Sequence, residues 1–463
     1  MTGSLSMIML DQTVVSVALP SMTRDLPLSP TGQQWVVNAY VLALAALVAI
    51  GGKLGDRFGG VTTFRWGVTI FFVASVGCGL VPHGSWGQPA IIGFRALQGV
   101  GAALMMPVSA AIVMGAFPLA ERGRAMAAYA GISQIFLAVG PLVGGLLTQL
   151  VSWRAVFWLN VPVGVAALIL VRVAAPQNVR RADARVPLTS ASLLVAGVGA
   201  TVLAVQQASY WSWTSPTTLL TLLVGVALTT LFVVRQLGDS APVVNVRLFA
   251  RRGYLADVLV VGLTQFGLLA VVLFSSLYLQ DLLHQGPIKA GLAVLPLVLP
   301  ITAAAQIGGR WYDRSGVRAP VVTGLSLAFA GLIAWTISLP SLNYWLQTPG
   351  MVLTGLGLGL ILSPSNTDAL GRVEVSERSQ ASGLMQTVRQ LGGTLGVALI
   401  GAIVLGIEHH GTSGGRQHAA DAITAGFAAA AVSFLVALVV GYRLLSRDRL
   451  TEAPAREPAA ALA

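Results

Sequence analysis

The chain has 463 residues, of which 55% are hydrophobic and 10% charged, and its mean hydropathy is +0.78. Because a soluble domain carries roughly 25% charged residues, this composition excludes a soluble globule of this size. The net charge of +11 does not indicate a nucleic-acid partner, since the basic residues gather in alternate connections between apolar segments. The only cysteine, Cys78, leaves no intramolecular disulfide to form.

Apolar stretches of about 20 residues recur along the chain, which is typical of transmembrane helices and not of membrane-spanning strands. We expect fourteen spans, at residues 1–22, 35–54, 64–82, 89–115, 125–149, 155–173, 188–208, 216–235, 254–279, 289–309, 319–339, 347–365, 381–405 and 422–444. Most of the 28 Arg and Lys residues lie in the connections on one side, and the exceptions outside the spans are Arg24, Arg154, Lys289 and Arg416. The basic side, which holds both termini, is therefore predicted to be cytoplasmic in a multi-pass protein of the cell membrane.

Two charged stretches repeat each other 257 residues apart: GGKLGDRFG at 51–59 and GGRWYDRSG at 308–316. A second repeat supports the first, since Glu121-Arg122 recurs as Glu377-Arg378. Related halves are how many secondary transporters are built. We predict a six-helix half at 1–173, a cytoplasmic linker at 174–187, an inserted transmembrane hairpin at 188–235, a second linker at 236–253, a six-helix half at 254–445 and a disordered cytoplasmic tail at 446–463.

The repeated stretches are candidates for a cytoplasmic gate. Glycines such as Gly52 let helices approach closely, and an aspartate at the membrane surface can pair with an arginine or cap a helix of the other half. Such a contact exists only when the two halves are closed together. The alternative interpretation is a solvated turn that only satisfies topology. The gate residues that we predict are Gly52, Asp56, Arg57, Asp313 and Arg314.

Two ionisable residues lie deep in the first half. Asp11 is about 16 Å along the first helix at 1.5 Å per residue, near the middle of a ~30 Å hydrocarbon core. Arg95, in the fourth span, lies at a depth within reach of Asp11. Burial favours a neutral acid and a neighbouring arginine favours the carboxylate, so the pair can serve as a proton carrier. A static ion pair that fixes helix contacts is the alternative.

The fifth span contains GISQIFLAVGPLVGG at 131–145. Proline removes a backbone hydrogen bond and kinks a helix, whereas small residues permit close helix contacts. Gly140, Pro141, Gly144 and Gly145 therefore indicate either a hinge or glycine-rich contacts without a special role.

These motifs, together with LDQTVVSVALP at 10–20, WRAVFWLNVPVG at 153–164 and RQLGGTLGVA at 389–398, resemble the major facilitator superfamily, specifically its fourteen-helix drug:proton antiporter branch. The resemblance runs from residue 10 to about 400. It implies an all-α polytopic fold and proton-driven efflux of drugs or antibiotics, with Asp11 and Arg95 in the coupling site and the glycines of the fifth span in the antiporter helix. A metabolite or sugar facilitator or symporter on the same fold is the alternative.

The remaining predictions concern the substrate. We assign four polar residues to the substrate cavity: Gln98, Gln134, Gln386 and Arg389. Asp257 closely follows Arg251 and Arg252 and is expected to be a solvated surface residue, and no deep carboxylate is expected in the last four spans. The substrate is then neutral, zwitterionic or weakly anionic. An enzyme is not expected, because no nucleophile, acid/base or metal-ligand cluster lies at one depth. We expect a monomer in a lipid bilayer whose partners are a small molecule and protons, without a metal or a cofactor.

Overall fold

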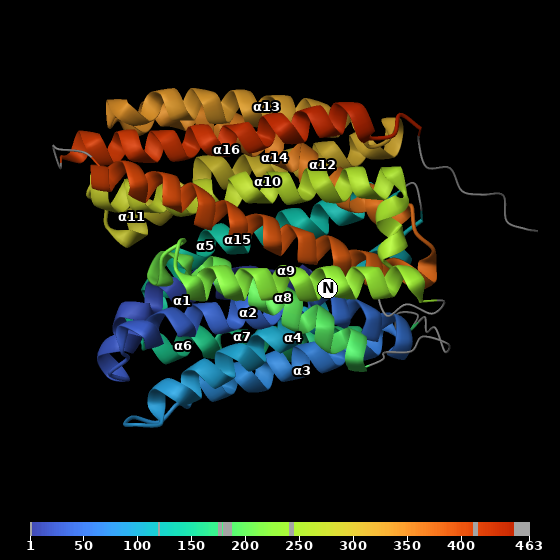
Figure 1. The fold of residues 1–463 in the computed structure, drawn as a ribbon, viewed down its shortest axis with the longest axis horizontal. Coiled ribbons are helices and arrows are strands. Elements are labelled where there is room, and N and C mark those ends of the chain that lie inside the picture. Colours follow the sequence, from blue (N-terminus) through green and yellow to red (C-terminus); the bar gives the residue numbers. More distant parts are fainter. Residues whose placement is uncertain are drawn as a thin grey trace, which may run out of the picture.

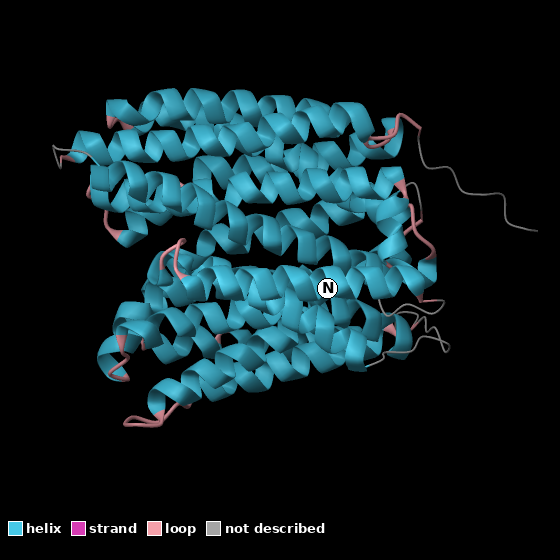
Figure 2. Ribbon diagram, viewed as in Figure 1, coloured by secondary structure: helices cyan, strands magenta, loops and turns pink. Residues whose placement is uncertain are grey.

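The computed structural model describes residues 2–118, 121–174, 178, 188–239, 245–410 and 415–448. Within these residues the regular elements are helices and no strand occurs (Figure 2). Among the described residues eleven helices are long and apolar enough to cross a membrane, or twelve if the bent first helix counts as one span. The predicted tail lies outside the described residues except for 446–448, as does most of the predicted linker at 174–187.

The N-terminal half is a bundle of long helices that carries the blue to teal colours of Figure 1. It contains α1 (Thr2–Asp25), α2 (Pro30–Phe58), α3 (Gly60–Gly79), α4 (Gly87–Ala116), α5 (Arg122–Leu150), α6 (Trp153–Trp158) and α7 (Asn160–Ala174). The start of α2 shows why a helix begins where it does. Ser29 accepts a hydrogen bond from the backbone N–H of Gly32 at 3.0 Å, and Pro30 occupies the first turn, where a missing N–H has no cost.

The C-terminal half forms the upper layer of Figure 1, in yellow to red. It contains α10 (Arg252–Leu277), α11 (Pro287–Ala293), α12 (Leu295–Ser315), α13 (Arg318–Ser338), α14 (Tyr344–Gly371), α15 (Arg378–His410) and α16 (Arg416–Leu444). Four short turns accompany them: η2 (Val246–Ala250), the π-helical η3 (Tyr278–Leu282), η4 (Leu339–Ser341) and η5 (Val375–Glu377).

The last glycine of each repeated stretch has the same structural role. Gly59 ends α2 with φ of 93° and Gly316 ends α12 with φ of 79°. A side chain at these φ values would be strained, which explains why glycine stands at both positions. We call this end of the bundle, where α2, α12 and α16 end, the basic end.

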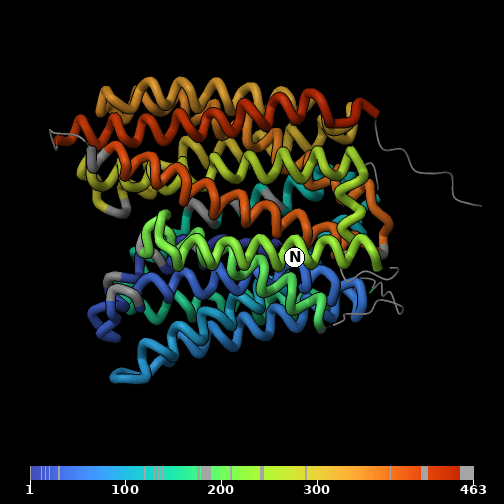
Figure 3. Tube along the Cα trace, viewed as in Figure 1, coloured from blue at the N-terminus to red at the C-terminus, as the bar shows by residue number. Residues whose placement is uncertain are grey.

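The two halves meet along two helix pairs, α5 with α12 and α2 with α15. One apolar core lies wholly in the C-terminal half, whereas another extends from the N-terminal half through α8 and α9 into α10, α14 and α15. The helices α8 (Leu188–Trp211) and α9 (Pro216–Gly238) pack against each other beside the junction (Figure 3). They cross closely because Gly197 of α8 lies against α9 and Gly225 of α9 lies against α8. A Cβ on Gly197 would lie 2.7 Å from the backbone nitrogen of Thr229. On its other side α8 contacts α2 and α15, one helix from each half.

Candidate functional site

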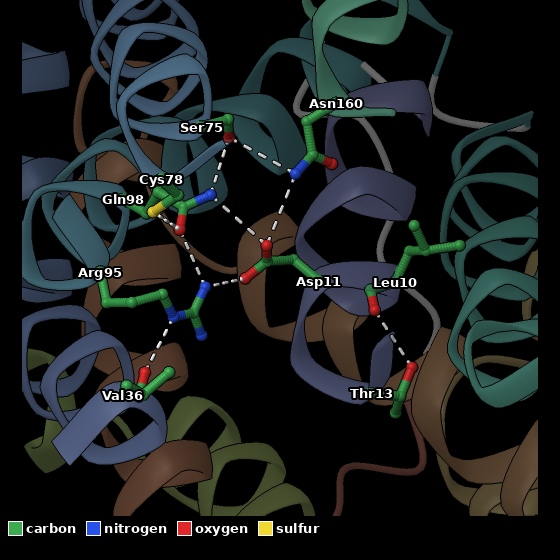
Figure 4. A network of polar contacts seen from close by, with 9 residues as sticks. All are labelled: Leu10, Asp11, Thr13, Val36, Ser75, Cys78, Arg95, Gln98 and Asn160. Carbon is green, nitrogen blue, oxygen red and sulfur yellow. Dashed lines mark hydrogen bonds and ion pairs between the residues drawn. The ribbon is translucent and has the colours of Figure 1, made fainter. Parts of the chain in front are cut away.

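Asp11 of α1 and Arg95 of α4 form an ion pair inside the N-terminal half (Figure 4). The guanidinium donates to the Asp11 carboxylate at 2.6 Å, and both side chains are 1% exposed. Arg95 also donates to the backbone carbonyl of Val36 at 2.9 Å, and it lies 4.5 Å from the ring centre of Tyr40. A buried charge is tolerated when it is paired and hydrogen-bonded, which describes this arginine. The two residues whose depths matched in the sequence are therefore in direct contact.

Three uncharged polar side chains complete this network (Figure 4). Gln98 accepts from Arg95 at 2.9 Å and donates to the hydroxyl of Ser75 at 2.7 Å, and Asn160 lies 3.5 Å from the Asp11 carboxylate. Gln98 was expected on the cavity wall, but the structure buries it beside the ion pair. Ser75 and Asn160 were not singled out from the sequence. The motif at 153–164, which contains Asn160, was the one signal that pointed to it.

The two repeated acidic residues each contact the start of a helix from the opposite half. Asp313 of α12 accepts a hydrogen bond from the backbone N–H of Gly123, in the first turn of α5, at 3.0 Å. Asp56 of α2 accepts hydrogen bonds from the hydroxyl of Ser379 and the backbone N–H of Gln380, in the first turn of α15. Free N–H groups and the helix dipole favour a carboxylate at this position. Two equivalent caps therefore join the halves at the basic end.

Close backbone contacts accompany both caps. A Cβ on Gly52 would lie 3.1 Å from the Cα of Gln380, and one on Gly309 would lie 2.8 Å from the carbonyl carbon of Gly123. The arginines of the repeats do not take part: Arg57 is exposed and lies 5.1 Å from the ring centre of its neighbour Phe58, and Arg314 is exposed. The halves are thus closed together at the basic end through glycines and aspartates.

The glycines of the fifth span bring α5 against α1. A Cβ on Gly140 would lie 3.0 Å from the Cβ of Thr13, and one on Gly144 would lie 3.0 Å from a methyl group of Val14. Gly145 is buried as well. The side chain of Pro141 lies outside the described residues. Both contacts fall within one helical turn of Asp11, so α5 lies directly against the segment that carries the ion pair.

Arg389 of α15 is a cation without a carboxylate partner in the part of the chain that the structure describes. Its Nε donates to the side chain of Gln265 at 3.1 Å, and the nearby Tyr129 of α5 belongs to the other half. Gln386, one turn before it, is buried, and its carbonyl oxygen accepts no hydrogen bond. The side chain of Gln134 lies outside the described residues. This arginine and amide can contact an acidic or polar ligand between the halves.

The prediction for Asp257 was wrong. The residue lies in the second turn of α10, is fully buried, and its carboxyl group faces that of Asp368 on α14. Asp368 is itself buried and accepts from Arg372 at 2.5 Å, so one of the last four spans does bury a carboxylate, although at its basic end. The error arose because α10 begins at Arg252 and turns Asp257 toward α14, away from its basic neighbours in sequence.

At the end opposite to the basic end, a pocket of about 790 Å³ opens to the surface where α11 contacts α5. Gln149 of α5 lines it on one side, and residues around α11 line it on the other, including His284, Lys289 and Tyr344. Among the described residues no group of three or more His, Cys, Asp or Glu side chains could hold a metal ion.

Comparisons with known proteins agree with this architecture. The Major Facilitator Superfamily profile matches residues 1–397. The puromycin resistance protein pur8 of Streptomyces alboniger is 35% identical over 418 residues, which are 88% of this chain and 82% of that protein. The tetracenomycin C resistance and export protein of Streptomyces glaucescens is 32% identical over 86% of this chain and 73% of its own length.

Among solved structures, the proton:xylose symporter XylE has a TM-score of 0.63 at 13% identity, over 93% of both chains. The human organic anion transporter MFSD10 also has a TM-score of 0.63, at 12% identity over 95% of this chain and 97% of that one. These likenesses concern the fold. Together with the profile and the curated relatives, they identify the chain as a multi-pass membrane transporter, and not an enzyme, that belongs to the major facilitator superfamily.

Proposed function

We propose that this chain exports drugs or antibiotics across the cell membrane in exchange for protons, by alternating access. The observation that carries the proposal is the buried Asp11–Arg95 pair beside the glycine contacts of α5. A carboxylate inside a membrane bundle marks a site for protons or substrates unless its role is purely structural. The resistance proteins among the relatives favour export over import.

The conformation of the bundle supports alternating access. At the basic end Asp56 and Asp313 cap helices of the opposite half, and at the other end a surface pocket of about 790 Å³ lies beside α11 and Gln149 of α5. With the basic end cytoplasmic, as the distribution of Arg and Lys indicates, the bundle is closed on its cytoplasmic side. The caps would then break each time the substrate enters from the cytoplasm.

The proposal includes fourteen spans in a monomer with both termini in the cytoplasm. The helices α5 and α12, of 29 and 21 residues, are not among the spans counted above but form the junction between the halves. Counting them with the other long helices gives two six-helix halves and the α8–α9 pair as an inserted hairpin.

Arg389 narrows the substrate class. Among the described residues this cation between the halves has no carboxylate partner, which favours a substrate with a carboxylate or a polar oxygen, because charge-assisted hydrogen bonds to arginine are among the strongest available. We propose that the substrate is neutral, zwitterionic or weakly anionic, with Arg389 and Gln386 against it.

The experiment is substrate-induced proton release in proteoliposomes, with wild type and Asp11→Asn. Puromycin, a neutral macrolide and an anionic drug serve as probes, and Asp25→Asn serves as a control that removes a partly exposed carboxylate of the same helix. We expect proton release in wild type and in Asp25→Asn, and its loss in Asp11→Asn with binding retained. Unchanged proton release in Asp11→Asn would make Asp11 a structural partner of Arg95, and transport that ignores the pH gradient would favour a facilitator.

A further inference from the structure

A second buried acidic group lies in the C-terminal half, at the basic end. Asp257 of α10 and Asp368 of α14 face each other, and neither side chain is more than 1% exposed. Asp368 accepts from Arg372 at 2.5 Å and from the hydroxyl of Tyr312, on α12, at 3.3 Å. Neither oxygen of Asp257 accepts a hydrogen bond from a donor in the described part of the chain. Asp368 is thus matched by one arginine, whereas Asp257 has no cation or donor of its own among these residues.

Four ionisable groups surround Asp257. They are Asp368 and Arg372 of α14, the phenol of Tyr312 on α12 and the phenol of Tyr254 on α10. In the described part of α15, α16 and η2, which also contact α10, no further charged group acts on it. With both acids ionised the cluster would carry one uncompensated negative charge away from water, which is strongly unfavourable. A proton held between the two oxygens removes that charge and supplies the donor that Asp257 lacks.

The acidic pair is also connected to both gate contacts. Tyr312, which bonds Asp368, is followed by Asp313, which caps α5 of the other half. Tyr254, one turn before Asp257, donates at 2.7 Å to the carbonyl of Ala381, in the first turn of α15, where Asp56 binds. Both tyrosine contacts lie within the C-terminal half, next to the residues of the gate, so separation of the halves at the basic end would admit water close to the acidic pair.

The repeat shows that this pair is not part of the shared scaffold. With the offset of 256 that aligns Glu121 with Glu377, Asp368 corresponds to Ile112, an apolar residue. Asp368 therefore has no acidic counterpart in the first half.

We propose that Asp257 and Asp368 form a proton-binding site that holds one proton while the basic end is closed and releases it to the same side when the basic end opens. This proton is distinct from the one coupled to transport at Asp11, because it enters and leaves on one side of the membrane. Acidification on the basic side therefore favours the closed state. The inference rests on the alternating access proposed above.

The test measures opening of the basic end directly. Spin labels on Arg65→Cys and Arg443→Cys, two exposed positions near the basic end of opposite halves, report the distance between α3 and α16 by double electron–electron resonance in lipid nanodiscs. Cys78 is fully buried and stays in place. All samples carry Asp11→Asn, so that the coupling pair does not titrate. The pH is varied from 5.5 to 8.5.

We expect the ratio of closed to open populations to fall with rising pH, by up to about tenfold per unit for one linked proton. Asp257→Asn mimics the protonated acid, so its closed population should be high and independent of pH. Asp368→Asn should flatten the dependence too. The controls Tyr312→Phe, which keeps both acids, and Asp421→Asn, which removes an exposed acid of the same half, should retain the slope.

Several outcomes would overturn the proposal. One is a distance distribution that does not respond to pH when Asp257 and Asp368 are both intact. Another is a pH dependence of the closed-to-open ratio that persists in Asp257→Asn and Asp368→Asn. The third is a distance that responds to Na⁺ at constant pH and not to protons. If the distance changes with puromycin but not with pH, only this proposal fails. If one distance persists under every condition, alternating access itself fails.

Discussion

The Asp11–Arg95 pair allows a quantitative prediction about folding stability. The Arg95 guanidinium donates to the Asp11 carboxylate, to Gln98 and to the carbonyl of Val36, at 2.6, 2.9 and 2.9 Å, and the pair is 1% exposed. Asp11→Asn keeps the shape but leaves the arginine charge buried without a counter-charge. Loss of one partner of a buried pair costs about 3–5 kcal/mol, and we expect a cost in this range for Asp11→Asn.

The assay is reversible unfolding in mixed detergent micelles of Asp11→Asn, Arg95→Gln and the double variant. We expect the double variant to be less destabilised than the sum of the single variants by at least about 2 kcal/mol, because it leaves no charge unpaired. The control is the Asp25–Arg154 pair, whose side chains are 34% and 19% exposed, and for which we expect at most about 1 kcal/mol. The reasoning is refuted if Asp11→Asn and Arg95→Gln lower the free energy of unfolding by less than substitutions in the Asp25–Arg154 pair do.

Three further predictions concern the gate, the substrate and the hairpin. Gly309→Ala places a methyl group 2.8 Å from the carbonyl carbon of Gly123, so it should shift the basic end toward the open state, with a larger spin-label distance at fixed pH; an unchanged distance would contradict the gate. Arg389→Gln should weaken binding of carboxylate drugs by about 10- to 100-fold, as measured by scintillation proximity, and leave neutral drugs unaffected; equal losses for both would exclude an anion contact. Gly197→Leu should separate α8 from α9 at Thr229 and lower the free energy of unfolding by about 1–3 kcal/mol in the same assay. The control is Gly84→Ala: Gly84 has a positive φ and no atom near its Cβ position, so this substitution measures the cost of backbone strain alone.

Two kinds of feature could be predicted from the sequence: the depth of charged residues within the helices and the relation between the two halves. Helix length and rise place Asp11 and Arg95 at similar depths, and charged residues inside an apolar span are conspicuous enough to be paired by that arithmetic. The duplicated glycine stretches likewise predict related halves, and Gly59 and Gly316 have the same structural role in the two halves. These features follow from local geometry along a single helix or turn.

Side-chain direction around a helix could not be predicted in the same way. Asn160 and Ser75 are uncharged and stand in apolar runs, so hydropathy does not distinguish a member of the network from a lipid-facing residue. Asp257 is close to basic residues in sequence, yet a residue two turns into a helix can point to any side, and its neighbour Asp368 is more than one hundred residues away. The choice is made by tertiary contacts between α10 and α14, which hydropathy does not record.

The ion pair and the gate lie in different places, and a physical connection between them is needed if protons drive transport. Asp11 and Arg95 both belong to the N-terminal half, so their interaction does not by itself hold the halves together. The helix α5 contacts α1 through Gly140 and Gly144, and its first turn, at Gly123, is capped by Asp313 of the other half. We infer that α5 connects the two sites: protonation of Asp11 that weakens the ion pair frees α1 to move, and close backbone contact at Gly140 transmits the movement to α5 and to its cap.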